Sequence, residues 1–162
     1  MIIIITIISF ILEFMLNSFL YNTVLIPLCV ICTLILIEPF FYKNKTKYLI
    51  YSFTIGLLYD LIFTGNYFLS SGIFLLIASL IILINKITPN NLLISIIEII
   101  TFICIYRTIS FLLMSIFQII PFELELLSKS IFCSLSLNII FSIILYFIMY
   151  IISKKFNIIR IN

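Results

Sequence analysis

The run at residues 92–117, LLISIIEIITFICIYRTISFLLMSIF, decides the class of fold to which this chain belongs. Its only charged residues are Glu98 and Arg107, and it exceeds the roughly 20 apolar residues that cross the hydrocarbon core of a membrane as a helix. Lipid offers no partner to backbone N–H and C=O groups, so a spanning segment is a helix or a strand of a closed barrel. Because the run shows no alternation of polar and apolar residues, we predict a helix.

The composition of the whole chain also points to a protein surrounded by lipid. Of 162 residues, 65% are hydrophobic and 9% are charged, whereas a soluble domain is about 45–50% apolar and about 25% charged. These values exclude a soluble enzyme, a disordered chain and a secreted disulfide scaffold. A net charge of +3 spread over the chain forms no basic patch, so no nucleic-acid partner is expected. We therefore expect an integral membrane protein surrounded by membrane lipids.

Turn-forming residues and charges divide the chain into apolar spans, at about 2–20, 23–42, 48–64, 67–84, 92–117 and 130–152. The breaks fall at 21–22, 43–47, 65–66, 85–91 and 118–129. No linker separates the spans, so we predict a single all-α domain over 1–162, a bundle of six transmembrane helices. The third and fourth spans are joined by a very short turn, and fusing them gives a five-span alternative.

Lysine and arginine in short loops indicate which side of the membrane is cytoplasmic. With six spans, one side would hold Lys43, Lys45, Lys47, Lys86, Lys154, Lys155 and Arg160, and the other side only Lys129. Both termini are then cytoplasmic. The first span has neither a basic start nor a small-residue cleavage site, so we expect it to be retained.

Five ionisable residues lie within the spans: Glu13, Glu38, Asp60, Glu98 and Arg107. Each costs about 2.5–3.5 kcal/mol at a helix centre, so each needs a partner inside the bundle. With a rise of about 1.5 Å per residue, Glu13 and Asp60 lie about 16–18 Å from the cytoplasmic side and Arg107 about 22 Å from it. These depths allow Arg107 to pair with Asp60 or with Glu13.

The other two acidic residues lie nearer the cytoplasmic ends of their spans. Glu38 is within reach of Lys43, and Glu98 is within reach of a lysine from 43–47. Three roles are open for the intramembrane charges: pairs that hold the helices together, a proton or ion relay, and an interface with another membrane protein.

The most specific local feature is the sequence GLLYD at 56–60, followed by TGN at 64–66. Gly56 and Asp60 are four residues apart, so they share one face of a helix. A glycine on that face allows a neighbouring backbone to approach closely, and the aspartate beside it can then bond to that neighbour. The pattern predicts that another helix packs at this place.

These residues carry a resemblance to a known family. The stretch YSFTIGLLYDL at 51–61, the lysine-bearing loop before it, and Leu137-Asn138 in the last span followed by Ser153-Lys154-Lys155 are similar to MreD, the rod shape-determining membrane protein family of bacteria. The family has a similar length, five or six spans and a Gly-x-x-x-Asp third span. In its fifth span it often has an acidic residue where Arg107 stands here.

The resemblance implies a non-enzymatic subunit of the cell-elongation complex in the bacterial cytoplasmic (inner) membrane, supporting cell-wall synthesis and cell shape. The implied partner is a bitopic MreC-like protein, and through it MreB-like filaments, a RodA-like transglycosylase and its penicillin-binding partner. We expect helix-packing or partner-binding roles for Gly56, Asp60, Gly65, Arg107, Glu13 and Asn138. The family fold resembles the substrate-binding subunits of energy-coupling-factor vitamin transporters, which supplies an alternative function.

Signals for catalysis, metals or cofactors are weak in this sequence. The chain has no histidine, and it contains no Walker loop and no Gly-x-Gly-x-x-Gly. Cys29 and Cys32 form a Cys-x-x-Cys pair inside the second span, but further metal ligands are missing from the sequence around them. We expect these cysteines to pack as small hydrophobic residues, and we predict no catalytic residue, no metal site and no cofactor.

Overall fold

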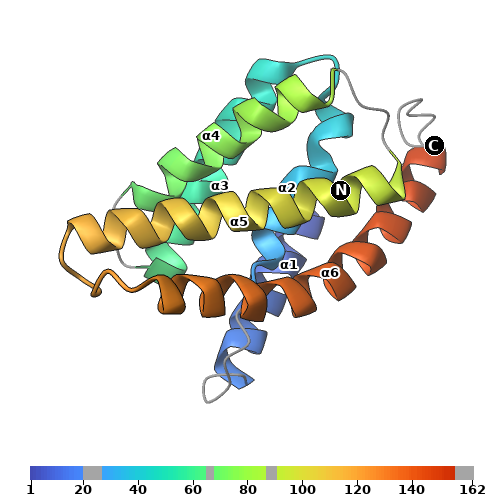
Figure 1. The fold of residues 1–162 in the computed structure, drawn as a ribbon. Coiled ribbons are helices and arrows are strands. Elements are labelled where there is room, and N and C mark those ends of the chain that lie inside the picture. Colours follow the sequence, from blue (N-terminus) through green and yellow to red (C-terminus); the bar gives the residue numbers. More distant parts are fainter. Residues whose placement is uncertain (20–26, 65–67, 87–90, 156–162) are drawn as a thin grey trace.

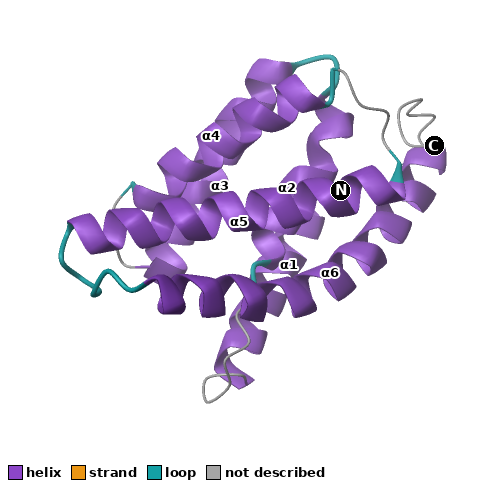
Figure 2. Cartoon of the chain, in the orientation of Figure 1, coloured by secondary structure: helices purple, strands orange, loops and turns teal. Residues whose placement is uncertain are grey.

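A computed structural model of the chain describes residues 1–19, 27–64, 68–86 and 91–155 (Figure 1). Of these residues 88% are helical and none forms a strand, which confirms the predicted all-helical class (Figure 2). The elements are α1 (Ile2–Phe19), α2 (Cys29–Ile37), the 3-10 turn η1 (Glu38–Phe41), α3 (Lys45–Tyr59), the π-helical turn η2 (Asp60–Thr64), α4 (Leu69–Ile84), α5 (Leu92–Ile116) and α6 (Leu124–Lys155).

Several helices have the length and composition of membrane spans. Within the described ranges, three are long and apolar enough to cross a membrane: α1, α5 and α6 as far as Lys154. The apolar segments Cys29–Phe41 and Leu69–Ile84 are shorter. Exposed isoleucine, leucine and phenylalanine side chains are numerous on α1, α5 and α6, and such apolar surfaces suit contact with lipid or with other membrane helices.

Helix α2 lies at the centre of the bundle (Figure 1). All nine of its residues are buried, and it contacts α1, α4, α5 and α6. Around it, α3 and α4 form one closely packed pair and α5 and α6 form another. The largest fully buried side chains are Tyr48, Phe74 and Phe102. The Tyr48 hydroxyl donates a hydrogen bond to the Leu34 carbonyl at 2.9 Å, so α3 is also tied to the backbone of α2.

Two helix starts differ by six residues from the sequence prediction, and the other described boundaries differ by three residues or fewer. The second span was expected from residue 23, but residues 27–28 are irregular and α2 begins at Cys29. Leu28 has a non-helical backbone, and its N–H bonds to the Asn138 side chain on α6 in place of a helix carbonyl. The sixth span was expected from residue 130, but α6 begins at Leu124. Leucine and glutamate favour helices, and Glu125 in the first turn interacts well with the helix dipole.

Helix α5 ends near the predicted boundary in a Schellman motif. Gln118 has a left-handed φ of 57°. Its N–H donates to the Ser115 carbonyl at 3.0 Å, and the Ile119 N–H donates to the Met114 carbonyl at 2.9 Å. These bonds satisfy carbonyls that the helix end would otherwise leave without partners, and they turn the chain toward α6.

Candidate functional site

The N-terminus of α2 begins inside the bundle, where its first N–H groups need partners that lipid cannot supply. Leu28 precedes the helix and has no side-chain oxygen to cap it. Instead, the Leu28 N–H donates to Asn138 Oδ1 on α6 at 2.8 Å. The Val30 N–H donates to Glu13 Oε2 on α1 at 2.9 Å. Two side chains from other helices therefore act as caps for α2.

Glu13 joins three helices through its two oxygens. Its side chain is fully buried, and its second oxygen accepts a hydrogen bond of 2.6 Å from the Tyr59 hydroxyl on α3. With the Val30 contact, the carboxylate links α1, α2 and α3. An ionisable residue that looks costly in the sequence thus supplies acceptors to groups that would be costlier without them.

The glycine and aspartate of the GLLYD sequence both contact the start of α4. A Cβ built on Gly56 would lie 2.4 Å from Ser71 Cα and 3.1 Å from the Ser70 carbonyl oxygen, so only glycine allows this approach. Asp60 Oδ1 accepts the Ser70 N–H at 2.8 Å, and Asp60 Oδ2 accepts the Ser71 N–H at 3.0 Å. Phe68, which precedes α4, has a positive φ of 69° and no capping side chain.

The helix that packs against this face of α3 is therefore α4 of the same chain. Gly56 and Asp60 contact the same two serines, so the close approach and the cap operate together. A partner protein cannot use these two side chains unless α4 is displaced. In the structure, both residues pack α3 against α4.

A second polar cluster lies at the opposite end of the bundle, around Glu38. The sequence interpretation paired Glu38 with Lys43, but Lys43 is exposed and Glu38 forms an ion pair with Lys45, which lies one residue after the N-cap of α3. Glu38 also accepts a hydrogen bond of 2.9 Å from the Asn85 side chain at the end of α4. Glu98 is buried on α5 and lines a small cavity together with Pro39, the residue after Glu38.

Asn138 and Cys32 lie together in the core. The Cys32 thiol is 3.8 Å from Asn138 Oδ1 and donates toward it, and both side chains are fully buried. Cys29 and Cys32 are free thiols. No group of three or more metal-ligating side chains occurs in the described part of the chain.

Arg107 does not pair with Asp60 or Glu13 in the way the depths suggested. The carboxylates of Asp60 and Glu13 accept the backbone and tyrosine donors described above. The Nε and Nη2 atoms of Arg107 are buried and have no hydrogen-bond partner among the described residues. Glu13 still attracts Arg107 electrostatically, but without a hydrogen bond between them in the contacts described.

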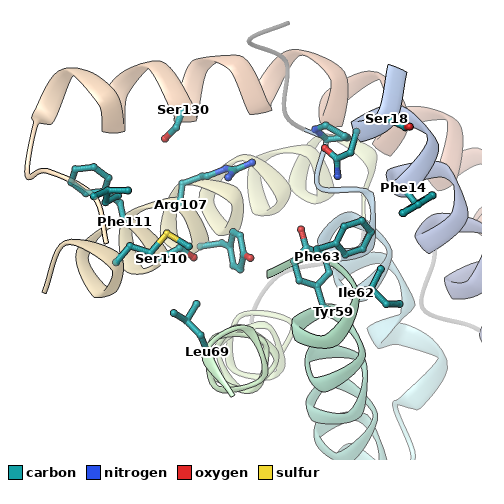
Figure 3. Close-up of a pocket in the computed structure, with 15 residues that line it drawn as sticks. Phe14, Ser18, Tyr59, Ile62, Phe63, Leu69, Arg107, Ser110, Phe111 and Ser130 are labelled. Atoms are coloured by element: carbon teal, nitrogen blue, oxygen red, sulfur yellow. The ribbon is translucent and has the colours of Figure 1, made fainter. Parts of the chain in front are cut away.

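Arg107 lines a cavity of about 550 Å³ (Figure 3). In the close-up its side chain extends from α5 into the space, with Ser130 of α6 on one side and Tyr59 and Phe63 on the other. The wall is mostly apolar and aromatic with a few polar groups, formed by Phe14, Asn17, Ser18, Pro27, Tyr59, Ile62, Phe63, Leu69, Tyr106, Arg107, Ser110, Phe111, Met114, Ile120 and Ser130. Its volume falls in the range of small-molecule sites, about 300–1,000 Å³.

Comparison with known proteins supplies no relative: no family model, curated protein or solved structure matches the chain. The function is therefore argued from the residues themselves. Of the residues singled out in the sequence, Gly65 lies outside the described residues. The structure brings the Glu13 and Asn138 side chains together at the start of α2, where both accept backbone N–H groups. It brings Gly56 and Asp60 together at the start of α4.

Sequence reasoning missed the donors of these contacts. Tyr59 lies inside the GLLYD sequence, but nothing in the pattern marks its hydroxyl as the partner of Glu13. The N–H groups of Val30, Ser70 and Ser71 carry no sequence signal at all. Leu28 and Phe68, which precede α2 and α4, have no side-chain oxygen to cap a helix, but the predicted spans begin at 23 and 67 and so do not mark them as helix starts.

Proposed function

We propose that this chain is a non-enzymatic membrane subunit of the bacterial cell-elongation complex, of the MreD type, that binds a bitopic MreC-like protein. The observation that carries the proposal is the use of the intramembrane polar groups. Glu13, Asp60 and Asn138 accept backbone N–H groups of α2 and α4, and Glu38 pairs with Lys45. Groups used in this way build a rigid bundle, which suits a subunit that positions other membrane proteins.

The same contacts support six membrane crossings. Helices α2 and α4 are short, but side chains of the bundle accept N–H groups at both of their starts, so both can begin at membrane depth. The π turn η2 lengthens α3 in the same direction. Lys43, Lys45 and Lys86 lie at the end of the bundle that holds Glu38, which fits a cytoplasmic end with both termini on that side.

The outer surface supports a partner made of membrane helices. Helix α1 has only 17% of its most apolar window buried, so most of its side chains face outward. Large apolar residues such as Ile4, Ile7 and Ile11 are more than half exposed. A single transmembrane helix of an MreC-like protein can pack on such a face without displacing any contact of the bundle.

Co-purification tests this proposal. We expect the affinity-tagged chain, co-expressed with an MreC-like protein and extracted in mild detergent, to retain that protein in near-equal amount and to retain less of an unrelated bitopic protein at the same expression level. Ile4→Trp on α1 and Ile144→Trp on α6 form a matched pair that shows which exposed face is used. Recovery of no elongation-complex protein from bacterial membranes would count against the proposal.

The cavity beside Arg107 favours a second candidate, the substrate-binding subunit of an energy-coupling-factor vitamin transporter. Such a subunit needs a roomy pocket lined from several helices, and this cavity is formed by α1, α3, α4, α5 and α6. On the elongation-complex proposal, we expect equilibrium dialysis of the purified chain against radiolabelled vitamins to show no saturable binding. Saturable binding of one vitamin would replace the first proposal by the second.

A further inference from the structure

The cavity contains hydrogen-bond donors that have no partner among the described residues. Arg107 contributes two buried nitrogen atoms, Nε and Nη2, without partners among the described residues. One turn further along α5, Ser110 is 9% exposed, and its buried Oγ makes no hydrogen bond of good geometry, although it lies near the Tyr106 hydroxyl. Both side chains line the cavity and are labelled in Figure 3. Arg107 is half-buried, and the two buried nitrogens of its guanidinium call for an acceptor that can bond to both of them.

The nearby acidic groups do not supply that acceptor. Glu13 attracts Arg107, but its oxygens accept the Tyr59 hydroxyl and the Val30 N–H. Asp60 accepts two N–H groups at the start of α4. The acceptor for Arg107 therefore has to come from outside the described residues of the chain.

We propose that this cavity binds an amphiphilic oxyanion, a carboxylate or phosphate attached to an apolar body. The planar fork of Arg107 matches the geometry of two oxyanion oxygens, and the Ser110 hydroxyl can donate to a third acceptor site. Phe63, Leu69 and Phe111 line other parts of the wall and contact the apolar body. A bare inorganic ion would leave these apolar walls without a contact, and a cation would be repelled by Arg107.

The same chemistry can come from two sources, an anionic membrane lipid or a soluble organic acid. The walls of the cavity belong to helices whose outer faces are apolar, so we expect a lipid headgroup with part of its acyl chain. This inference does not require the proposed function, because it concerns a site inside the bundle and not the surface that would bind a partner protein.

Thermal unfolding of the purified chain in detergent tests the inference. The probes are phosphatidylglycerol, phosphatidylcholine, sodium hexanoate and inorganic phosphate. We expect phosphatidylglycerol to raise the unfolding temperature of the wild-type chain more than phosphatidylcholine does, since a ligand that binds only the folded state stabilises it. In Arg107→Gln we expect the concentration of phosphatidylglycerol needed for half of that shift to rise by about tenfold or more.

A control and a second variant keep the result interpretable. Lys129→Gln removes one positive charge at an exposed position next to Ser130, so a loss caused by net charge alone would affect both variants. Ser130→Trp fills the cavity from α6 and leaves Arg107 in place, and we expect it to abolish the shift as well. Without added lipid, Arg107→Gln should unfold close to the wild-type temperature, because neither Nε nor Nη2 makes a hydrogen bond that the change would remove.

The four probes separate the sources. An Arg107-dependent shift with phosphatidylglycerol assigns the site to a lipid headgroup, and such a shift with hexanoate alone assigns it to a soluble acid; either result supports an oxyanion site. An equal response of the wild type and Arg107→Gln to every probe overturns the inference. A response to inorganic phosphate alone overturns it too, because the apolar body would then have no role.

Discussion

Replacing Gly56 with alanine is expected to lower the free energy of unfolding by about 3 kcal/mol, at the upper end of the effects of overpacking. The added Cβ would lie 2.4 Å from Ser71 Cα and 3.0 Å from the Ser71 nitrogen. Both are backbone atoms of α4, so no side-chain rotation can relieve the contact. Helices α3 and α4 would have to separate, and the bonds from Asp60 to Ser70 and Ser71 would lengthen with them.

Gly72 provides the matched control one residue beyond that contact. A Cβ added there meets nothing within 4 Å. Because alanine favours a helix over glycine by up to about 1 kcal/mol, Gly72→Ala should leave stability unchanged or raise it. Titration of the purified proteins with sodium dodecyl sulfate in mixed micelles measures both variants. If the two glycine variants were equally stable, the close approach of α3 and α4 would be wrong.

The contacts of Gly56 and Asp60 with α4 show which part of the packing can be predicted from sequence alone. Two residues four apart share a helix face whatever the tertiary structure, so their joint use was predictable from spacing. That the neighbour is the next helix in the chain follows from the short connection after Thr64. Helices α1, α5 and α6 follow from apolar runs long enough to cross a membrane, which few other structures accommodate.

The contacts of Glu13 and Arg107 show where sequence reasoning ends. Depth places both near the same level of the membrane, but depth leaves rotation about the helix axis undetermined. In the structure Glu13 turns toward α2 and Tyr59, and Arg107 turns into the cavity. A pairing rule based on opposite charge misses the competing donors, because backbone N–H groups at a buried helix start are invisible in a sequence.

The central position of α2 was also not predictable from its composition. Its residues resemble those of the outer helices, and periodicity does not distinguish a helix surrounded by protein from one surrounded by lipid. The distinguishing feature is the location of its caps: Glu13 on α1 and Asn138 on α6 are far apart in sequence and meet at one helix end.

Removing the Asp60 carboxylate is expected to have an effect of similar size to the Gly56 change. Asp60→Ala leaves the N–H groups of Ser70 and Ser71 buried without acceptors, and two lost hydrogen bonds to a charged group correspond to about 3 kcal/mol of stability. Asp60→Asn keeps one acceptor oxygen and turns a donor toward the other N–H. We therefore expect a smaller loss, about 1–2 kcal/mol, with the fold and partner binding retained.

Glu125→Ala is the control for loss of a carboxylate, because Glu125 is exposed in the first turn of α6 and should contribute about 0.3–1 kcal/mol through the helix dipole. The same detergent titration ranks the three variants. A liposome proton-flux assay separates the cap from a relay: a capping role predicts no flux through the wild-type chain and none through either Asp60 variant. Wild-type flux that both Asp60→Asn and Asp60→Ala abolish would identify Asp60 as part of a proton path instead, since an amide can replace a capping oxygen but cannot carry a proton between donors and acceptors.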